Sequence, residues 1–247
     1  MRFNFEVDPA CDARVSLGLI ILQPDETLEN ELRFVFPDPS VALYHSRIPS
    51  QPSVTKETLL MMEKDLPTAA GLLPKNVSFG AIAYACTSGA TMIGQHVIRS
   101  KIQEHHPNVP VTDPITGAIA GFKALGVKKL GFLTPYVPEV SSSMRQLLED
   151  NDLQVSEFGS FEQEQENVVA RISESSTLDA IVQVGAASDC EAVFVSCTNL
   201  RTFGVLAEAE EILGKPVISS NLAIVWHLMR LAGIEGRISA PGQLFTV

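Results

Sequence analysis

The sequence lacks the features that mark several large classes of protein. No uninterrupted apolar run approaches the roughly 18 residues of a membrane span, and the first residues have no apolar core of a signal peptide. Eighteen Lys and Arg stand against 29 Asp and Glu, for a formal charge of −11. A nucleic-acid partner would need a basic patch. These absences predict a cytoplasmic protein that binds neither nucleic acid nor membranes.

Motifs for cofactors and metals are missing as well. No Cys-x-x-Cys occurs and the five His are scattered, so the sequence predicts no metal site. No Gly-x-Gly-x-x-Gly follows a strand-like segment, which argues against a dinucleotide enzyme. No lysine lies in a recognisable pyridoxal-phosphate context. We therefore predict chemistry without a cofactor.

Cysteine is scarce, but its placement is informative. The four cysteines fit no small secreted disulfide framework, and a cytoplasmic protein keeps them reduced. Two of them occur in matched segments, Ala-Tyr-Ala-Cys86-Thr87-Ser88 and Phe-Val-Ser-Cys197-Thr198-Asn199. Each apolar run ends in Cys-Thr and precedes a helical pattern. A buried strand would deliver each thiol to a ligand crevice, where the N–H groups of a helix start favour a thiolate or a carboxylate.

Strand-like and helix-like segments alternate along the chain, which predicts an α/β fold with parallel sheets. The predicted strands are 15–22, 41–45, 77–85, 109–112, 129–134, 155–158, 192–196 and 216–219. The predicted helices are 55–66, 90–104, 115–125, 138–150, 167–175, 179–187, 204–213 and 222–232.

The pattern restarts halfway, which indicates an internal repeat. The helix after each Cys-Thr strand is followed by a similar segment, Val-Pro-Val-Thr-Asp113 or Lys-Pro-Val-Ile-Ser219, and then by a closing helix. We predict two similar lobes, 1–127 with Cys86 and 128–247 with Cys197. Each would be a mostly parallel sheet flanked by helices, related to the other by pseudo-twofold symmetry, with the active site between them. The last helix could pack back on the first lobe.

Two thiols that flank one carbon can isomerise a substrate. A thiolate can remove a proton while the other thiol delivers one to the opposite face, or a thiolate can add to a double bond, allow rotation and leave. Both schemes need donors for the negative charge of the substrate, and the candidates are Thr87, Ser88, Thr198 and Asn199 with their N–H groups. The alternative is that both cysteines are small buried residues. Cys11 and Cys190, which precede no helix start, are predicted to be structural.

Three more residues are candidates for substrate contact. Asp25 follows the first strand, where it could act on a thiol, bind an amino group or merely cap a helix at 28–33. Tyr136 follows the first strand of the second half, and its phenol could donate to a substrate carboxylate or be structural. Asn167 opens a predicted helix and could be only a cap.

These segments, with Thr134-Pro-Tyr136 and the loop after the first strand, resemble the cofactor-independent aspartate/glutamate racemase superfamily. The branch that they resemble holds maleate cis–trans isomerases, arylmalonate decarboxylases and ectoine-utilisation proteins. The resemblance runs from Gly18 to the final helix. It implies that Cys86 and Cys197 are catalytic and that Thr87, Ser88 and Thr198 bind a carboxylate. It also implies that Tyr136 and Asn167 contact the substrate.

The resemblance also narrows the expected function. Arylmalonate decarboxylases keep only the second cysteine, so two cysteines favour an isomerase. Maleate isomerases carry Asn where this chain has Asp25, which disfavours maleate and favours an ammonium group.

We expect a two-cysteine isomerase, a racemase or a maleate-type cis–trans isomerase, acting on a small carboxylic acid or amino-acid derivative. The alternatives are a cysteine-dependent decarboxylase, lyase or hydrolase, and a pair of binding lobes without chemistry. A homo-oligomer is possible.

Overall fold

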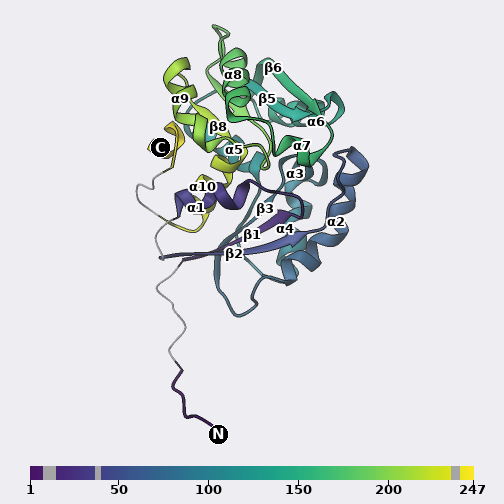
Figure 1. Cartoon of the computed structure of the whole chain (residues 1–247), viewed down its shortest axis with the longest axis vertical. Helices are drawn as coiled ribbons and strands as arrows, with labels where there is room; N and C mark the ends of the chain where they lie inside the picture. Colours follow the sequence, from purple (N-terminus) through teal and green to yellow (C-terminus); the bar gives the residue numbers. More distant parts are fainter. Residues whose placement is uncertain (8–14, 37–39, 235–239) are drawn as a thin grey trace.

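The computed structural model describes residues 1–7, 15–36, 40–234 and 240–247, so Cys11 lies outside the described residues. Its two lobes each contain a parallel four-stranded sheet, ordered β2-β1-β3-β4 and β6-β5-β7-β8 (Figure 1). Equivalent strands occupy equivalent places in the two sheets. The predicted α/β fold with two similar lobes is therefore confirmed, and the repeat in the sequence corresponds to a repeated topology.

The described part of the first lobe contains nine elements. They are β1 (Val15–Leu22), α1 (Leu28–Val35), β2 (Val41–Ile48), α2 (Lys56–Gly71), β3 (Phe79–Ala85), α3 (Thr87–Ile93), α4 (Gln95–Gln103), β4 (Val111–Thr112) and α5 (Pro114–Ala124). The central strand β1 is buried along nearly its whole length. Burial on both faces is typical of a parallel strand covered by helices on each side, which explains its continuous apolar sequence.

The second lobe repeats this alternation of strands and helices, with two successive helices after its second strand instead of its third. It contains β5 (Lys129–Tyr136), α6 (Pro138–Glu149), β6 (Gln154–Gln163), α7 (Glu166–Val169), α8 (Glu174–Gly185), β7 (Ala192–Val195), α9 (Phe203–Leu213), β8 (Val217–Ser219) and α10 (Ser220–Leu231), with a short 3₁₀ turn at Gln243–Thr246. Its central strands β5 and β7 are buried in the same way.

Two predicted helices are divided in the structure. The helix predicted at 90–104 starts earlier, at Thr87, and is broken into α3 and α4 by Gly94, whose φ of +88° is easily adopted only by glycine. The helix predicted at 167–175 ends at Val169. The next helix starts afresh at Glu174 because the Ser173 side chain accepts a hydrogen bond from the Ser176 N–H as its N-cap.

The two lobes pack against each other through helices at the boundary between them, which we call the seam. Helix α10 follows β8 of the second sheet but packs against α5, β3 and α1 of the first lobe, and α3 packs against α6. Figure 1 shows α3, α5 and α10 between the two sheets. The carboxyl ends of β3 and β7, each of which leads to one of the matched cysteines, meet at this seam. None of the described helices is long and apolar enough to cross a membrane.

Candidate active site

Cys86 lies at the junction of β3 and α3 and is the N-cap residue of α3. Its Sγ accepts a hydrogen bond of 3.2 Å from the Gly89 N–H and lies 3.6 Å from the Ser88 hydroxyl. Glycine is required at position 89, because a Cβ there would lie 2.4 Å from the Tyr84 phenol oxygen and 3.0 Å from Sγ. The segment after β3 thus presents the thiol to a helix N-terminus, as the sequence predicted.

Burial nevertheless outweighs these donors. Cys86 is only 2% exposed, and desolvation raises the pKa of its thiol to about 12. Ser88, Gly89 and Tyr84 lower that pKa, whereas Glu166 raises it by charge repulsion. The donors at the helix start therefore do not offset the burial of this thiol, and a pKa of about 12 favours the protonated sulfur at neutral pH.

Cys197 is held in a different way. It follows β7 by two residues and has a φ of +108°, a backbone conformation that is strained for any residue with a side chain. Its N–H donates to the Ser220 hydroxyl at 3.0 Å. Its Sγ accepts hydrogen bonds from the Tyr136 hydroxyl at 2.9 Å and the Asn199 N–H at 3.3 Å.

The helix predicted at 204–213 is α9, which begins at Phe203, but the expectation that the N–H groups of its start serve the Cys197 thiol is wrong. The Glu31 carboxylate accepts the N–H groups of Thr202 and Phe203 there. The donors to the second sulfur instead come from a tight turn and a phenol. Burial, followed by repulsion from Glu166, raises the pKa of the Cys197 thiol well above its usual value.

The two cysteine segments are in direct contact across the seam. The Thr87 hydroxyl lies 2.7 Å from the Ser220 hydroxyl, which also accepts the N–H of Cys197. The Thr198 hydroxyl donates to the Ala85 carbonyl, the residue before Cys86, at 3.4 Å. The structure therefore brings together the parts of the two lobes that the repeat pairs in the sequence. Ser220 was not among the predicted residues. It directly follows Lys-Pro-Val-Ile-Ser219, the segment that corresponds to Val-Pro-Val-Thr-Asp113 in the first half, and this position could have identified it as a site residue.

Asp25 reaches this seam from the loop after β1. Its Oδ1 accepts the N–H groups of Thr27 and Leu28, both at 2.9 Å, and so caps α1. Its Oδ2 is buried with no hydrogen-bond partner among the described residues. Burial raises the pKa of this carboxyl group, which is 5% exposed. Capping and a second function are therefore compatible, because each uses a different oxygen.

Asn199 ties the Asp25 loop to the second lobe. Its side-chain oxygen accepts the Glu26 N–H at 2.8 Å, and its backbone carbonyl accepts the Thr27 hydroxyl at 2.9 Å. Its side-chain nitrogen donates to Glu166, to Oε2 at 3.0 Å and to the carbonyl at 3.2 Å. The side chain of Asn199 is thus engaged on both sides within the protein, and its backbone N–H serves the Cys197 sulfur.

Glu166 is a second site residue that sequence reasoning missed. It opens α7 and is 4% exposed, while the neighbouring Asn167 is exposed and offers its carbonyl to Arg171 at 2.7 Å. Glu166 repels both thiolates and the carboxylate of Asp25, and burial raises its pKa to about 7. Glu166 ends the acidic run Glu162–Glu166, and such a run is typical of a solvated face. Only the bend between β6 and α7 turns its last member inward.

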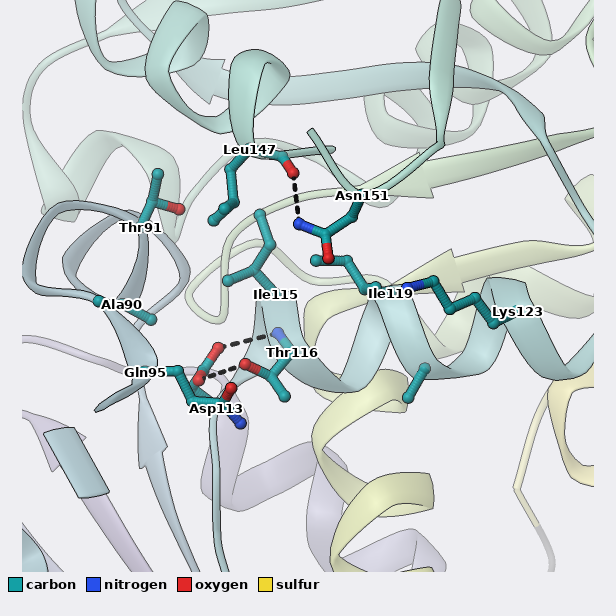
Figure 2. Close-up of a pocket in the computed structure, with 12 residues that line it drawn as sticks. Ala90, Thr91, Gln95, Asp113, Ile115, Thr116, Ile119, Lys123, Leu147 and Asn151 are labelled. Carbon is teal, nitrogen blue, oxygen red and sulfur yellow. Dashed lines mark hydrogen bonds between the residues drawn. The ribbon is translucent and has the colours of Figure 1, made fainter. Parts of the chain in front are cut away.

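A separate cavity of about 340 Å³ lies beside α3 (Figure 2). Its walls come from α3, α5 and α6, with Ile115 and Ile119 opposite Leu147. The Asp113 carboxylate on its wall accepts the N–H and hydroxyl of Thr116 as the cap of α5. Neither cysteine lines this cavity. Within the described ranges, no group of three or more His, Cys, Asp or Glu side chains is arranged to hold a metal ion.

Comparison with known sequences matches this chain to one family and two kinds of enzyme. Residues 81–245 match the family model described as arylmalonate decarboxylase. The arylmalonate decarboxylase of Bordetella bronchiseptica is 31% identical over 135 residues, which are 54% of this chain and 56% of that protein. The maleate isomerase of Alcaligenes faecalis is 20% identical over 244 residues, 93% of this chain and 96% of that protein.

Solved structures of the same two enzymes have this fold. A variant of the maleate isomerase Iso of Pseudomonas putida S16, in which one cysteine is replaced by alanine and which was solved with maleate, matches 94% of this chain and 97% of its own with a TM-score of 0.83 at 20% identity. A variant of arylmalonate decarboxylase, in which one glycine is replaced by cysteine and one cysteine by serine, matches 94% and 98% with a TM-score of 0.84 at 24% identity.

Proposed function

The chain belongs to the arylmalonate decarboxylase family, as its resemblance indicated, and from that premise we propose that it is a cofactor-independent isomerase in which Cys86 and Cys197 act on one carbon of a small carboxylic acid or amino-acid derivative. The observation that carries the proposal is the contact between the two Cys-Thr segments through Thr87, Ser220 and Thr198. This contact supports a single buried site to which each lobe contributes one thiol.

Each thiol has the donors that a thiolate needs. Gly89 and Ser88 serve the first sulfur, and Tyr136 and Asn199 serve the second. When one thiol has lost its proton, its sulfur takes the proton from the substrate carbon. The charge then spreads onto the substrate carboxylate, and the other thiol delivers its proton to the opposite face. The enzyme ends the turnover with the two protonation states exchanged.

The donors around the cysteines would hold the substrate carboxylate. Ser88 is the best placed hydroxyl, since it lies beside Sγ of Cys86 at the start of α3. The hydroxyl of Thr87 is shared with Ser220, and the hydroxyl of Tyr136 is committed to the Cys197 sulfur in the free site. Donors that are fixed before the substrate binds stabilise developing charge most effectively.

A decarboxylase is the second candidate, and the family match favours it. In that reaction the carbanion left by loss of CO₂ needs only one thiol to protonate it. The presence of a second cysteine, set in a matched segment and in contact with the first, supports the isomerase instead. A covalent route is also open, since a solved maleate cis–trans isomerase of Nocardia farcinica contains a bound succinylcysteine intermediate.

Isotope exchange distinguishes these reactions. The protein is incubated in D₂O with a panel of small acids and amino acids, and products are followed by NMR and mass spectrometry. Deuterium at one carbon with loss of chirality indicates racemisation, while isomerisation without incorporation indicates addition and rotation. Release of CO₂ with one deuterium in the product indicates decarboxylation. Turnover that survives substitution of either cysteine would contradict the two-cysteine mechanism.

A further inference from the structure

A buried tyrosine near Cys86 has a poor hydrogen-bond partner. Tyr84 lies on β3, two residues before the cysteine, and is fully buried. Its hydroxyl donates to the Met62 Sδ at 3.5 Å. A thioether is a weak acceptor, and a phenylalanine would fill the same space without the cost of burying a hydroxyl. The presence of the hydroxyl is explained if a better acceptor lies within its reach.

The Cys86 sulfur lies close to the same hydroxyl. A Cβ at position 89 would lie 2.4 Å from the Tyr84 oxygen, 3.0 Å from Cys86 Sγ and 3.0 Å from Met62 Cε. The three side chains thus surround one small space, which the glycine leaves open at the start of α3. The phenol also lowers the pKa of the Cys86 thiol, as expected of a donor that can face the sulfur.

A thiolate at Cys86 would depend on neutral donors. Apart from burial, the groups that shift the pKa of this thiol are the Ser88 hydroxyl, the Gly89 N–H and the Tyr84 hydroxyl, which lower it, and Glu166 of α7, which raises it. There is no lysine, arginine or histidine among these groups. Each neutral donor therefore matters more than it would beside a cation.

The second lobe provides a comparison, because it also has a tyrosine beside its thiol. Tyr136, at the end of β5, donates directly to Cys197 Sγ at 2.9 Å. Burial raises the pKa of both phenols, and nearby charges add to this, from Cys86 and Asp113 on Tyr84 and from both cysteines on Tyr136. Both phenols therefore keep their protons and remain donors. The difference is that one already binds its sulfur, whereas the other is bound to a thioether.

We propose that the Tyr84 hydroxyl is an exchangeable donor to Cys86, which binds the Met62 thioether while the thiol carries its proton and turns to the sulfur once that proton has passed to the substrate carbon. This inference rests on the proposed function, in which Cys86 alternates between thiol and thiolate. Tyr84 is a positioning residue that acts through Cys86. A hydrogen bond that forms only with the charged sulfur favours the thiolate without changing the resting site.

The reactivity of each cysteine toward methyl methanethiosulfonate tests the proposal. This small reagent reacts with the thiolate, and peptide mass spectrometry follows Cys86 and Cys197 separately in one sample. Both side chains are at most 2% exposed, so the ratio of the two rates corrects for the opening that admits the reagent. In Tyr84→Phe we expect the Cys86:Cys197 ratio to fall about fivefold at pH 8, in line with the loss of one hydrogen bond, and the pH profile of Cys86 to move upward.

Met62→Leu supplies the opposite test. Leucine has nearly the size of methionine but accepts no hydrogen bond, so the phenol becomes free for the sulfur and the same ratio should rise at least about twofold. Tyr136→Phe is the matched control in the second lobe, where it should slow Cys197 and leave the rate of Cys86 unchanged. Tyr84→Phe should also lower kcat about two- to fivefold with KM unchanged, because the phenol acts through the sulfur.

A tyrosine that only fills space would give a different pattern. An unchanged ratio in Tyr84→Phe or in Met62→Leu, or a fall in both, would overturn the exchange and leave the two-cysteine function standing. Turnover that survives Cys86→Ser would overturn the function itself. The reactivity ratio needs no substrate, so these two failures are distinguishable.

Discussion

The two lobes have the same strand order, yet they hold their cysteines by different means. In the first lobe a regular strand-to-helix junction presents Cys86, and backbone N–H donors come from α3. In the second, Cys197 has a strained backbone, no helix follows at once, and a phenol and a tight turn supply the donors. The comparison shows that two lobes with the same strand order can hold their cysteines with different hydrogen-bond donors.

The largest expected effect tests whether both cysteines are needed for turnover, although the two lobes hold them differently. Cys86→Ser and Cys197→Ser should each lower kcat by at least about 10²–10⁴-fold, because a hydroxyl replaces neither the nucleophile nor the proton donor. The measurement is steady-state turnover with whichever acid the exchange panel identifies.

Cys190→Ser is the matched control for this pair. Its sulfur accepts the Gly131 N–H at 3.2 Å and donates to the Ala192 carbonyl at 3.1 Å, contacts that a hydroxyl can keep. It should retain near-normal activity. If only one of the two site cysteines proved essential, the symmetry of the fold would have no counterpart in the mechanism, and the decarboxylase would be favoured.

The seam also contains two buried carboxyl groups whose pKa values rise from 4.5 to about 7, Glu31 from the first lobe and Glu166 from the second. A raised carboxyl pKa means that the folded state binds more protons between these values. The free energy of unfolding should therefore fall as pH rises from about 4.5 to 7, by up to roughly 3 kcal/mol for each group. Urea unfolding at pH 5 and pH 8 measures this fall.

Single substitutions assign the pH effect. Glu31→Gln and Glu166→Gln should each reduce the loss of stability between pH 5 and pH 8. Glu191→Gln, at an exposed carboxyl group whose pKa is lowered by the backbone N–H groups of Lys128 and Lys129, should not. An identical pH dependence in the wild type and both seam variants would show that burial does not control these groups.

A smaller effect is expected from substitution of Gly89, whose N–H donates to the Cys86 sulfur. Gly89→Ala places a Cβ 2.4 Å from the Tyr84 oxygen and 3.0 Å from Met62, so it should destabilise the fold by about 1–3 kcal/mol. It should also lower activity by moving the Cys86 sulfur. Thermal unfolding with far-UV circular dichroism measures the first effect. A variant as stable as the wild type would mean that this junction is looser than the structure indicates.

The smallest effect compares the tyrosine beside each thiol. Tyr136→Phe removes a 2.9 Å hydrogen bond to the Cys197 sulfur and should lower kcat by about tenfold, in line with the net strength of one hydrogen bond. Tyr84→Phe removes a phenol that donates to the Met62 sulfur at 3.5 Å, and it should cost less. A larger loss of kcat in Tyr84→Phe than in Tyr136→Phe would show that turnover depends more on the surroundings of Cys86 than on those of Cys197.

Local sequence patterns were sufficient for the fold and for pairing the two Cys-Thr segments that are in contact. Continuous apolar runs predict buried parallel strands, and β1 occupies the residues expected of it. The same patterns could not find Glu166, because its charge stands in an acidic run and only a tertiary bend turns it inward. Nor could the patterns predict the direction in which the pKa values of the two thiols are shifted. A helix start predicts a lowered pKa, whereas the packing of both lobes over the sulfurs raises it.

The central claim is that both thiols act on one carbon, and a crystal structure of the Cys197→Ser variant with a substrate acid tests it most directly. The account predicts the acid between the lobes, its carboxylate at the start of α3, and one carbon in contact with both Cys86 Sγ and the hydroxyl at position 197. An acid that contacts only one of these two side chains, or that lies in the cavity behind α3, would contradict it.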